Sequence, residues 1–395
     1  MKWIDEIKFR ASIGKTGTQD ISDYMYMTLF ACDSYADASA LYASQLGNDD
    51  IKWESTKQKD LGIDFSFLNG RLGGTFGGYW KNTDGALFNV VAAPSSGFPG
   101  YISNFAELSN KGLELELFAD PIRTKNFTWH VGFNVSRNIS CVEKIAGEID
   151  VYEAGTDVLV QGMPLGVLYA YKADGIIETE EELEEYKQQF YAIKGIENYW
   201  SSDYPCLSVG DPKFALNERA RDYRDVIGDI NPDFYGGFNT QFNYKNWFMN
   251  ASFTYAYGNQ LLYVRDKDDM SFGYSSNGQF ANRSPQALNP DEGRANVHAN
   301  PSHRLMLSSV NMYDASYLRM NSLSIGCNIP AKFLQKANMT SGSIYLSGSN
   351  LFTLTKYPGA DPAICNDPYS ISGGGLDVSS YPYSRTYSLG VRFGF

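Results

Sequence analysis

The feature that most constrains the fold is a regular alternation of apolar and polar side chains at the C-terminal end, residues 384–395. Successive side chains of a β-strand point to opposite faces, so this segment has one apolar face and one polar or small face. The pattern favours a transmembrane strand with aromatic side chains toward lipid and Arg392 toward a wet interior. The apolar face consists of Tyr387, Leu389, Val391, Phe393 and Phe395, and we expect it to mark the closing strand of a barrel.

The same alternation recurs along the chain, which predicts an all-β fold, an antiparallel transmembrane β-barrel with about ten strands in this chain. Lys245-Asn246 separates two such segments and Asn69-Gly70 separates two others, and both are β-hairpin signals. The segment 315–329 alternates less regularly, which predicts a β-bulge. The expected strands are 6–14, 57–68, 71–82, 107–119, 127–140, 234–244, 247–258, 315–329, 341–355 and 384–395.

The connections between these strands alternate between short and long. This rhythm is typical of outer-membrane barrels, which have short periplasmic turns and long external loops. In one long connection, Thr179 and Glu182 form a capping-box pattern, which predicts a short amphipathic helix over 179–193. The short connections are 69–70, 120–126, 245–246 and 330–340, and the long ones are 15–51, 83–106, 141–232, 259–314 and 356–383.

Composition excludes several other classes of protein. Aromatic residues make up 15% of the chain, yet no apolar run approaches the roughly 18 residues that a membrane helix needs. The net charge of −12 argues against nucleic-acid binding. The five cysteines lack metal-ligand spacing, and neither a GxSxG motif nor a histidine triad is visible. We therefore expect no enzyme, no cofactor and no metal site.

The N-terminal residues 1–7 show no apolar signal-peptide core. A protein of the bacterial cell outer membrane needs an export signal. We therefore expect that residues 1–395 are the C-terminal part of a larger barrel protein, with the signal peptide on a separate N-terminal part.

Several blocks resemble the SusC/RagA family of TonB-dependent outer-membrane transporters from Bacteroidota. They occur in the family's order and run nearly from end to end. The blocks are Asn110-Lys-Gly-Leu-Glu-Leu-Glu-Leu, Gly162-Met-Pro-Leu-Gly-Val-Leu-Tyr, Gly228-Asp-Ile-Asn-Pro-Asp-Phe-Tyr-Gly-Gly, Tyr317-Leu-Arg-Met-Asn-Ser-Leu-Ser-Ile-Gly, residues 344–362 and the ending 381–395.

The resemblance implies a 22-stranded barrel with an N-terminal plug domain. This chain would supply only the last ten or so strands, without the plug. The resemblance further implies TonB-dependent import of glycan fragments or oligopeptides. The implied partners are a SusD-like surface lipoprotein, TonB through the N-terminal part, outer-membrane lipids, and the oligosaccharide or peptide substrate.

Two groups of residues are candidates for contact with a solute. Aromatic rings in the expected external loops could stack on sugars or apolar side chains. The alternative is that they pack the loops together or form the outer aromatic girdle. The loop aromatics are Tyr199, Trp200, Phe272, Tyr274, Tyr369 and Tyr381, and the expected lumen-lining residues are His130, Asn239, Gln241, Asn250 and Arg392.

A second functional class remains open at this point, namely a passive pore or a structural or surface-interaction barrel in the outer membrane. Ten strands alone would leave two open edges, which are not viable in lipid. Either function therefore requires further strands to close the barrel.

Overall fold

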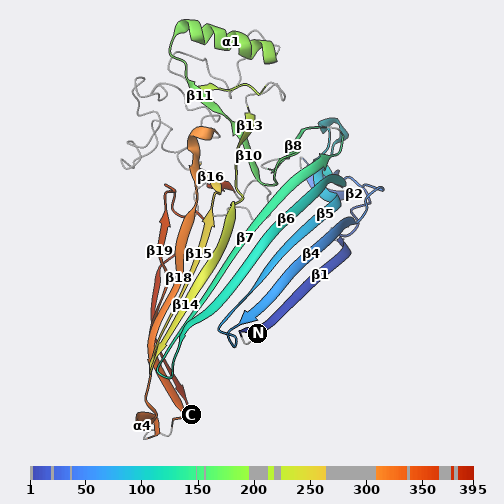
Figure 1. The fold of residues 1–395 in the computed structure, drawn as a ribbon. Coiled ribbons are helices and arrows are strands. Elements are labelled where there is room, and N and C mark those ends of the chain that lie inside the picture. The colour runs from blue at the N-terminus through green and yellow to red at the C-terminus, as the bar shows by residue number, and fades with distance from the viewer. Residues whose placement is uncertain are drawn as a thin grey trace.

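The structure is a computed structural model, and it is built mainly from antiparallel β-strands (Figure 1). The structure describes residues 3–18, 22–35, 38–147, 149–154, 157–194, 212–217, 224–263, 308–335, 339–363, 375–377 and 381–395.

One curved sheet of ten strands forms the body of the molecule, and each strand pairs antiparallel with the next large strand along the chain. This up-and-down order agrees with the predicted barrel fold. The two outer strands are β1 and β21, and the structure pairs each of them on one side only. In order the strands are β1 (Ile4–Thr18), β4 (Glu54–Phe67), β5 (Leu72–Val91), β6 (Gly100–Arg123), β7 (Phe127–Ile145), β14 (Phe234–Tyr244), β15 (Trp247–Tyr257), β18 (Tyr317–Asn328), β19 (Ser341–Thr355) and β21 (Thr386–Gly394).

The two ends of the sheet differ. At one end, tight hairpins join β4 to β5 and β14 to β15, and both chain termini and the short helix α4 (Ala331–Leu334) lie there (Figure 1). We call it the short-turn end, and the opposite one the long-loop end. Asn69 and Gly70 take left-handed φ values of 58° and 71°. These values explain why Asn-Gly marks the hairpin, because both residues tolerate that conformation.

The prediction of a long loop at 83–106 is wrong. Strand β5 continues to Val91 and β6 begins at Gly100, so only residues 92–99, including the 3-10 turn η1 (Pro94–Ser96), connect them. The added lengths are held by a compact apolar cluster at the long-loop end, in which Phe105 and Val142 are buried. Tertiary packing therefore extends both strands beyond the alternating segments. The short–long rhythm fails at this one connection.

The predicted bulge in the 315–329 segment is confirmed. The register of β18 shifts opposite Ser252/Phe253 of β15 and between Met320 and Ser322 opposite β19. The extra residue puts Ser322 and Arg319 on the same face although they are three positions apart. Met320 pairs with Phe253 on the opposite face.

Small sheets and one long helix, α1 (Glu180–Lys194), rise above the long-loop end (Figure 1). The predicted helix is confirmed, because the backbone N–H of Glu182 donates to the Thr179 hydroxyl at 3.1 Å. The small sheets comprise β2 (Leu29–Tyr35) with β3 (Ala38–Gln45), β8 (Val151–Ala154) with β9 (Asp157–Val160), β10 (Val167–Tyr171) with β13 (Arg224–Asp229), β11 (Ala173–Ile176) with β12 (Pro212–Phe214), and β17 (Met312–Asp314) with β16 (Gln260–Tyr263) and β20 (Leu376–Asp377); the 3-10 turn η3 (Ser309–Asn311) precedes β17.

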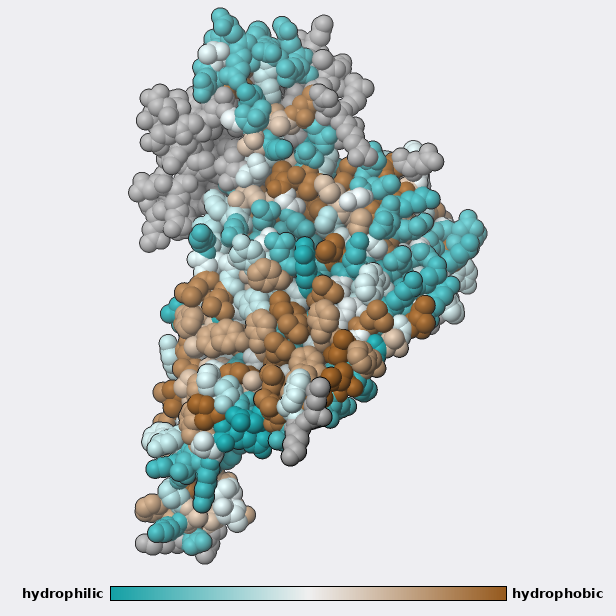
Figure 2. All heavy atoms as spheres, in the orientation of Figure 1, coloured by the Kyte–Doolittle hydropathy of each residue, from teal (hydrophilic) through white to brown (hydrophobic). Residues whose placement is uncertain are grey.

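Hydrophobic cores occur at the long-loop end rather than in the middle of the sheet. One lies under β8 and β9, and another surrounds Leu261, Tyr263 and Tyr357. Over the middle of the sheet, large apolar side chains stay exposed and form a brown band with hydrophilic surface above and below it (Figure 2). An exposed apolar band of this kind suits contact with lipid rather than water.

Candidate functional site: the polar face of the sheet

Cross-strand pairing sorts the sheet into an apolar face and a polar face. Met249, Ile325, Leu346 and Leu389 are successive partners across β15, β18, β19 and β21 and form one apolar row. The next row is displaced by one residue along each strand, so its side chains lie on the opposite, polar face. That polar row runs through His130, Gln241, Asn250, Ser324, Ser347 and Ser388.

The structure places all five residues predicted to line a lumen on this polar face. His130, Gln241 and Asn250 are direct cross-strand neighbours. Asn239 lies in an adjacent row opposite Ser252, whereas Arg392 is several strands away on β21, opposite Ser343. The prediction from alternation therefore gave one shared face, and only the register revealed which members are close together.

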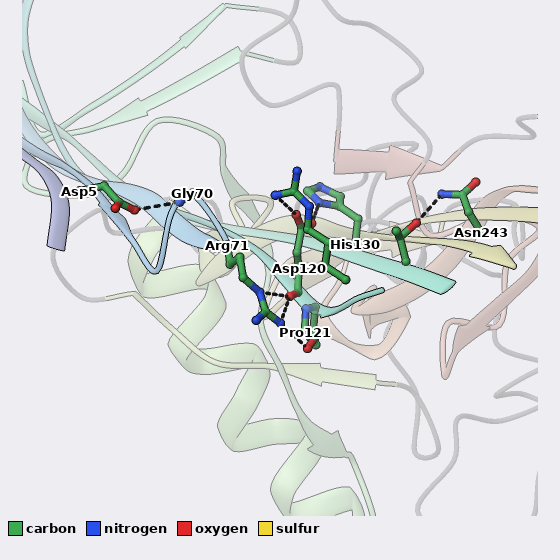
Figure 3. A network of polar contacts seen from close by, with 9 residues as sticks. Asp5, Gly70, Arg71, Asp120, Pro121, His130 and Asn243 are labelled. Atoms are coloured by element: carbon green, nitrogen blue, oxygen red, sulfur yellow. Dashed lines mark hydrogen bonds and ion pairs between the residues drawn. The ribbon is translucent and has the colours of Figure 1, made fainter. Parts of the chain in front are cut away.

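His130 belongs to a polar network at the short-turn end (Figure 3). Its Nδ1 lies 2.7 Å from Oδ1 of Asp120. The guanidinium of Arg71 donates to the backbone carbonyls of Asp120 at 3.1 Å and Pro121 at 2.9 Å. Arg123 approaches the other carboxylate oxygen of Asp120 at 3.9 Å. Asp120 lies at a shift in the register between β6 and β7. The network therefore connects this irregular end of β6 to neighbouring segments.

A groove of about 490 Å³ is sunk into the polar face across β1, β4, β5, β6 and β7. Two glycines, Gly62 and Gly77, are cross-strand partners and line it. A Cβ atom at Gly77 would meet only the Leu61 carbonyl oxygen, at 3.6 Å, so open space lies above this residue. The Arg10 guanidinium lies over Gly62, 3.2 Å from the position of a Cβ atom, so the open floor of the groove is at Gly77.

Tyr79 borders the groove, and its side chain lies against the polar face of the sheet. Its hydroxyl donates to Oδ1 of Asn138 at 2.8 Å, although Asn138 is on β7, two strands away. The ring passes over Gly112 of the intervening strand, where a Cβ atom would come within 2.5 Å of the ring. Gly112 thus permits an aromatic side chain to lie against the sheet with its position fixed by a hydrogen bond.

Charged groups surround this groove, with more carboxylates than cations. The carboxylate of Asp60 accepts hydrogen bonds from Ser12 at 2.9 Å and Gln58 at 2.8 Å. Arg10 is paired with Asp64 at 2.9 Å. The lining carboxylates Asp60, Glu114 and Glu116 face a single lining guanidinium, that of Arg10. The groove therefore offers hydrogen-bond acceptors and a negative potential.

A buried ion pair fastens a long loop to the polar face. Arg319 and Asp361 have side-chain exposures of 8% and 7% and bond directly to each other. Arg319 also donates from Nε to Thr353 at 3.1 Å and lies over the rings of Tyr317 and Tyr383. The pair links the start of the connection after β19 to the first residues of β18. The sequence shows both residues but no signal that joins them.

Most of the predicted loop aromatics, namely Tyr199, Trp200, Phe272, Tyr274 and Tyr369, fall outside the described residues. Tyr381 is described and is 91% exposed, just before β21. The sequence reasoning missed Tyr24 and Trp53, which are exposed and border a hollow of about 360 Å³ near the β2–β3 hairpin. Sequence pattern carries no signal for that exposure.

The residues predicted for the closing strand lie on the apolar face. Leu389 is 75% exposed, and its direct partner is Leu346. Because β21 is an outer strand, these side chains have a neighbour on one side only. The full set is Tyr387, Leu389, Val391, Phe393 and Phe395, and every member is exposed.

Two kinds of feature are absent from the residues that the structure describes. No group of three or more His, Cys, Asp or Glu side chains in them is arranged to hold a metal ion. No helix among them has the length and apolar character to cross a membrane.

Comparison with known proteins finds similarity to TonB-dependent receptors along the chain. Residues 1–165 match the family model described as "TonB dependent receptor-like, beta-barrel". TonB-dependent receptor P3 of Formosa agariphila is 31% identical over 98% of this chain and 39% of its own length. TonB-dependent receptor SusC of Bacteroides thetaiotaomicron is 26% identical over 99% of this chain and 38% of its own length. The chain carries a TonB-dependent receptor β-barrel domain, and it is similar to receptors that include SusC.

Solved structures support this assignment at the level of the fold. The structure described as that of the RagAB peptide transporter aligns with a TM-score of 0.78 at 20% identity, over the whole of this chain. It is covered over 41% of its length. The chain spans about two fifths of the length of the proteins that it matches.

Proposed function

We propose that this chain is the barrel part of an importer in the bacterial outer membrane, which takes up glycan fragments or oligopeptides through a TonB-dependent mechanism. The observation that carries the proposal is the similarity over 98% of the chain to a protein named as a TonB-dependent receptor. The two-faced sheet supports it, because an importer needs a polar path enclosed by an apolar outer surface.

The proposal requires that further strands close the barrel. β1 and β21 present unpaired backbone groups, and each such group costs several kcal/mol in the hydrocarbon of a membrane. We therefore propose that residues 1–395 supply ten strands of a 22-stranded barrel, with the plug domain and export signal carried by the rest of the intact protein. His130, Asn239, Gln241, Asn250 and Arg392 would then line the lumen.

The proposed partners follow from this arrangement. The small sheets and the helix α1 at the long-loop end would lie outside the cell and contact a SusD-like surface lipoprotein. TonB would act through the plug-bearing part, and lipid would cover the apolar band. The loop aromatics named from sequence stay predictions for contact with an oligosaccharide or a peptide.

The test is energised uptake by a Bacteroidota host that carries the intact gene, compared with a strain from which the gene is deleted. Labelled oligosaccharides and oligopeptides serve as probes. Uptake that depends on the gene and stops with a proton uncoupler supports the proposal. Gene-dependent entry that is unaffected by the uncoupler would instead favour the alternative, a passive pore or a structural barrel.

A further inference from the structure

We propose that the groove over Gly62 and Gly77 is a binding subsite for one ring of an oligosaccharide that carries no negative charge. This inference rests on the proposed import function and deepens it by naming a solute class and its contact residues. None of the residues that line the groove was among the binding candidates named from the sequence.

The groove has the size of a small-molecule site. Its volume of about 490 Å³ lies within the range of small-molecule sites, which is about 300–1,000 Å³. The floor is open at Gly77, and the Arg10 guanidinium lies over its cross-strand partner Gly62. Neither glycine has a positive φ, so backbone conformation does not demand glycine at these positions. Gly77 provides the open space, and Gly62 leaves room for the Arg10 guanidinium at its edge.

Tyr79 supplies an aromatic ring of fixed position at the border of the groove. Its ring is held along the wall by Gly112 beneath it and by the hydrogen bond from its hydroxyl to Asn138. A ring fixed in this way offers an apolar surface at little loss of side-chain entropy. The C–H surface of a sugar ring matches such a surface, while its hydroxyls stay free to bond elsewhere.

The lining polar groups supply those bonds. Glu114 and Glu116 lie two residues apart on β6 and therefore point to the same face. Neither makes a hydrogen bond or ion pair with another residue that the structure describes. Their carboxylates can each accept bonds from sugar hydroxyls, and the Arg10 guanidinium can donate. Three lining carboxylates against one cation would repel an anionic sugar.

The same groove is poorly suited to an extended peptide. Peptides commonly join a sheet by pairing with the free backbone groups of an edge strand. Here the floor lies between β4 and β5, whose backbone groups are already paired with each other and with β1 and β6. Recognition must therefore come from side chains, which favours a hydroxyl-rich ring.

The test fills the groove without disturbing the sheet. Gly77→Leu places a side chain in the open space of the floor, and Tyr79→Ala removes the ring. Gly14→Leu is the matched control, because Gly14 is on the same face of β1, has no atom within 4 Å of its Cβ position and lies outside the groove. Heat-modifiable migration of the purified intact protein checks that each variant is folded.

The probes are fluorescently labelled neutral hexasaccharides of hexose and pentose units, the same sugars bearing carboxylates, and a library of hexapeptides. We expect at least one neutral hexasaccharide to bind wild type and Gly14→Leu equally and to bind Gly77→Leu and Tyr79→Ala at least tenfold more weakly. Binding of no neutral sugar, unchanged sugar binding by Gly77→Leu, or loss of affinity for peptides only would each overturn the proposal. Sugar binding without energised uptake would instead overturn the import function alone.

Discussion

A charge placed on either face of β19 tests the assignment of the two faces directly. Leu346 lies in the apolar row and is 57% exposed, with Leu389 and Ile325 as its cross-strand neighbours. Its neighbour Ser347 belongs to the polar row. Leu346→Arg and Ser347→Arg therefore introduce the same side chain one residue apart and on opposite faces.

The expected difference follows from depth in the membrane. Leu346 is the sixth residue of β19 counted from the short-turn end. At about 3.4 Å per residue and a tilt of about 40°, it lies roughly 13 Å above the start of the strand, near the middle of an apolar band about 25 Å tall. An arginine toward lipid at that depth costs about 2–4 kcal/mol. Ser347→Arg meets water in the proposed lumen and should cost less than about 1 kcal/mol.

The assay is urea unfolding of the intact protein in lipid vesicles, with the free energy of unfolding compared between wild type and the two variants. A loss of about 2–4 kcal/mol for Leu346→Arg and a small change for Ser347→Arg support the assignment. Equal losses for both variants, or a larger loss for Ser347→Arg, would refute the reasoning about the two faces.

Three further predictions concern the long-loop end. Arg319→Met leaves the buried Asp361 carboxylate without its partner and should destabilise the protein by about 3–5 kcal/mol in urea unfolding, with Asp361→Asn in the same background recovering part of the loss. Leu159→Ala removes a side chain that is 1% exposed and should cost about 2–5 kcal/mol, seen as faster hydrogen exchange in β8 and β9. The hydrogen bond from Lys213 lowers the pKa of Glu182 and raises the pKa of Lys213, so the contact stabilises α1 between about pH 5 and pH 10. It is lost as pH falls through the lowered pKa of Glu182, and the hydrogen-exchange protection factors of the α1 amides, which correct for the intrinsic pH dependence of exchange, should then fall.

Each of these expectations can fail in a distinct way. Unchanged stability of Arg319→Met would mean that water replaces the ion pair. Unchanged exchange in β8 and β9 after Leu159→Ala would mean that the cluster does not hold these strands. Lys213→Met is the control for the acid effect, because it should remove the pH dependence of the protection factors in α1. A pH dependence that survives in that variant would assign it to another group.

Several strands of the sheet could be predicted because their apolar and polar residues alternate with a period of two. In 234–244, 247–258 and 341–355 the position of a residue in this alternation is enough to assign its side chain to one face. The expected segments agree with β14, β15 and β19 to within one residue at each end. The bulge in β18 was predictable for the same reason, because an extra residue interrupts the period.

Strand ends at the long-loop end could not be predicted in this way. Residues 83–91 and 100–106 carry no clean alternation, and the side chains of Phe88, Val90 and Phe105 pack in the apolar cluster at the long-loop end. Their strand conformation comes from packing under β8 and β9, which follow far later in the chain. Continuation of β5 and β6 is thus a tertiary effect.

The sequence by itself determined the membrane-barrel class, the two faces of its strands, the α1 helix and the family resemblance, since each depends on neighbours in the chain or on ordered blocks. Only the tertiary structure decided which polar residues meet. Register brings Gly62 opposite Gly77 and places Tyr79 over Gly112, and it joins Arg319 to Asp361. The physical reason is that alternation determines which face of the sheet a side chain is on, whereas the register between strands determines which residues of neighbouring strands lie beside it. A groove depends on both.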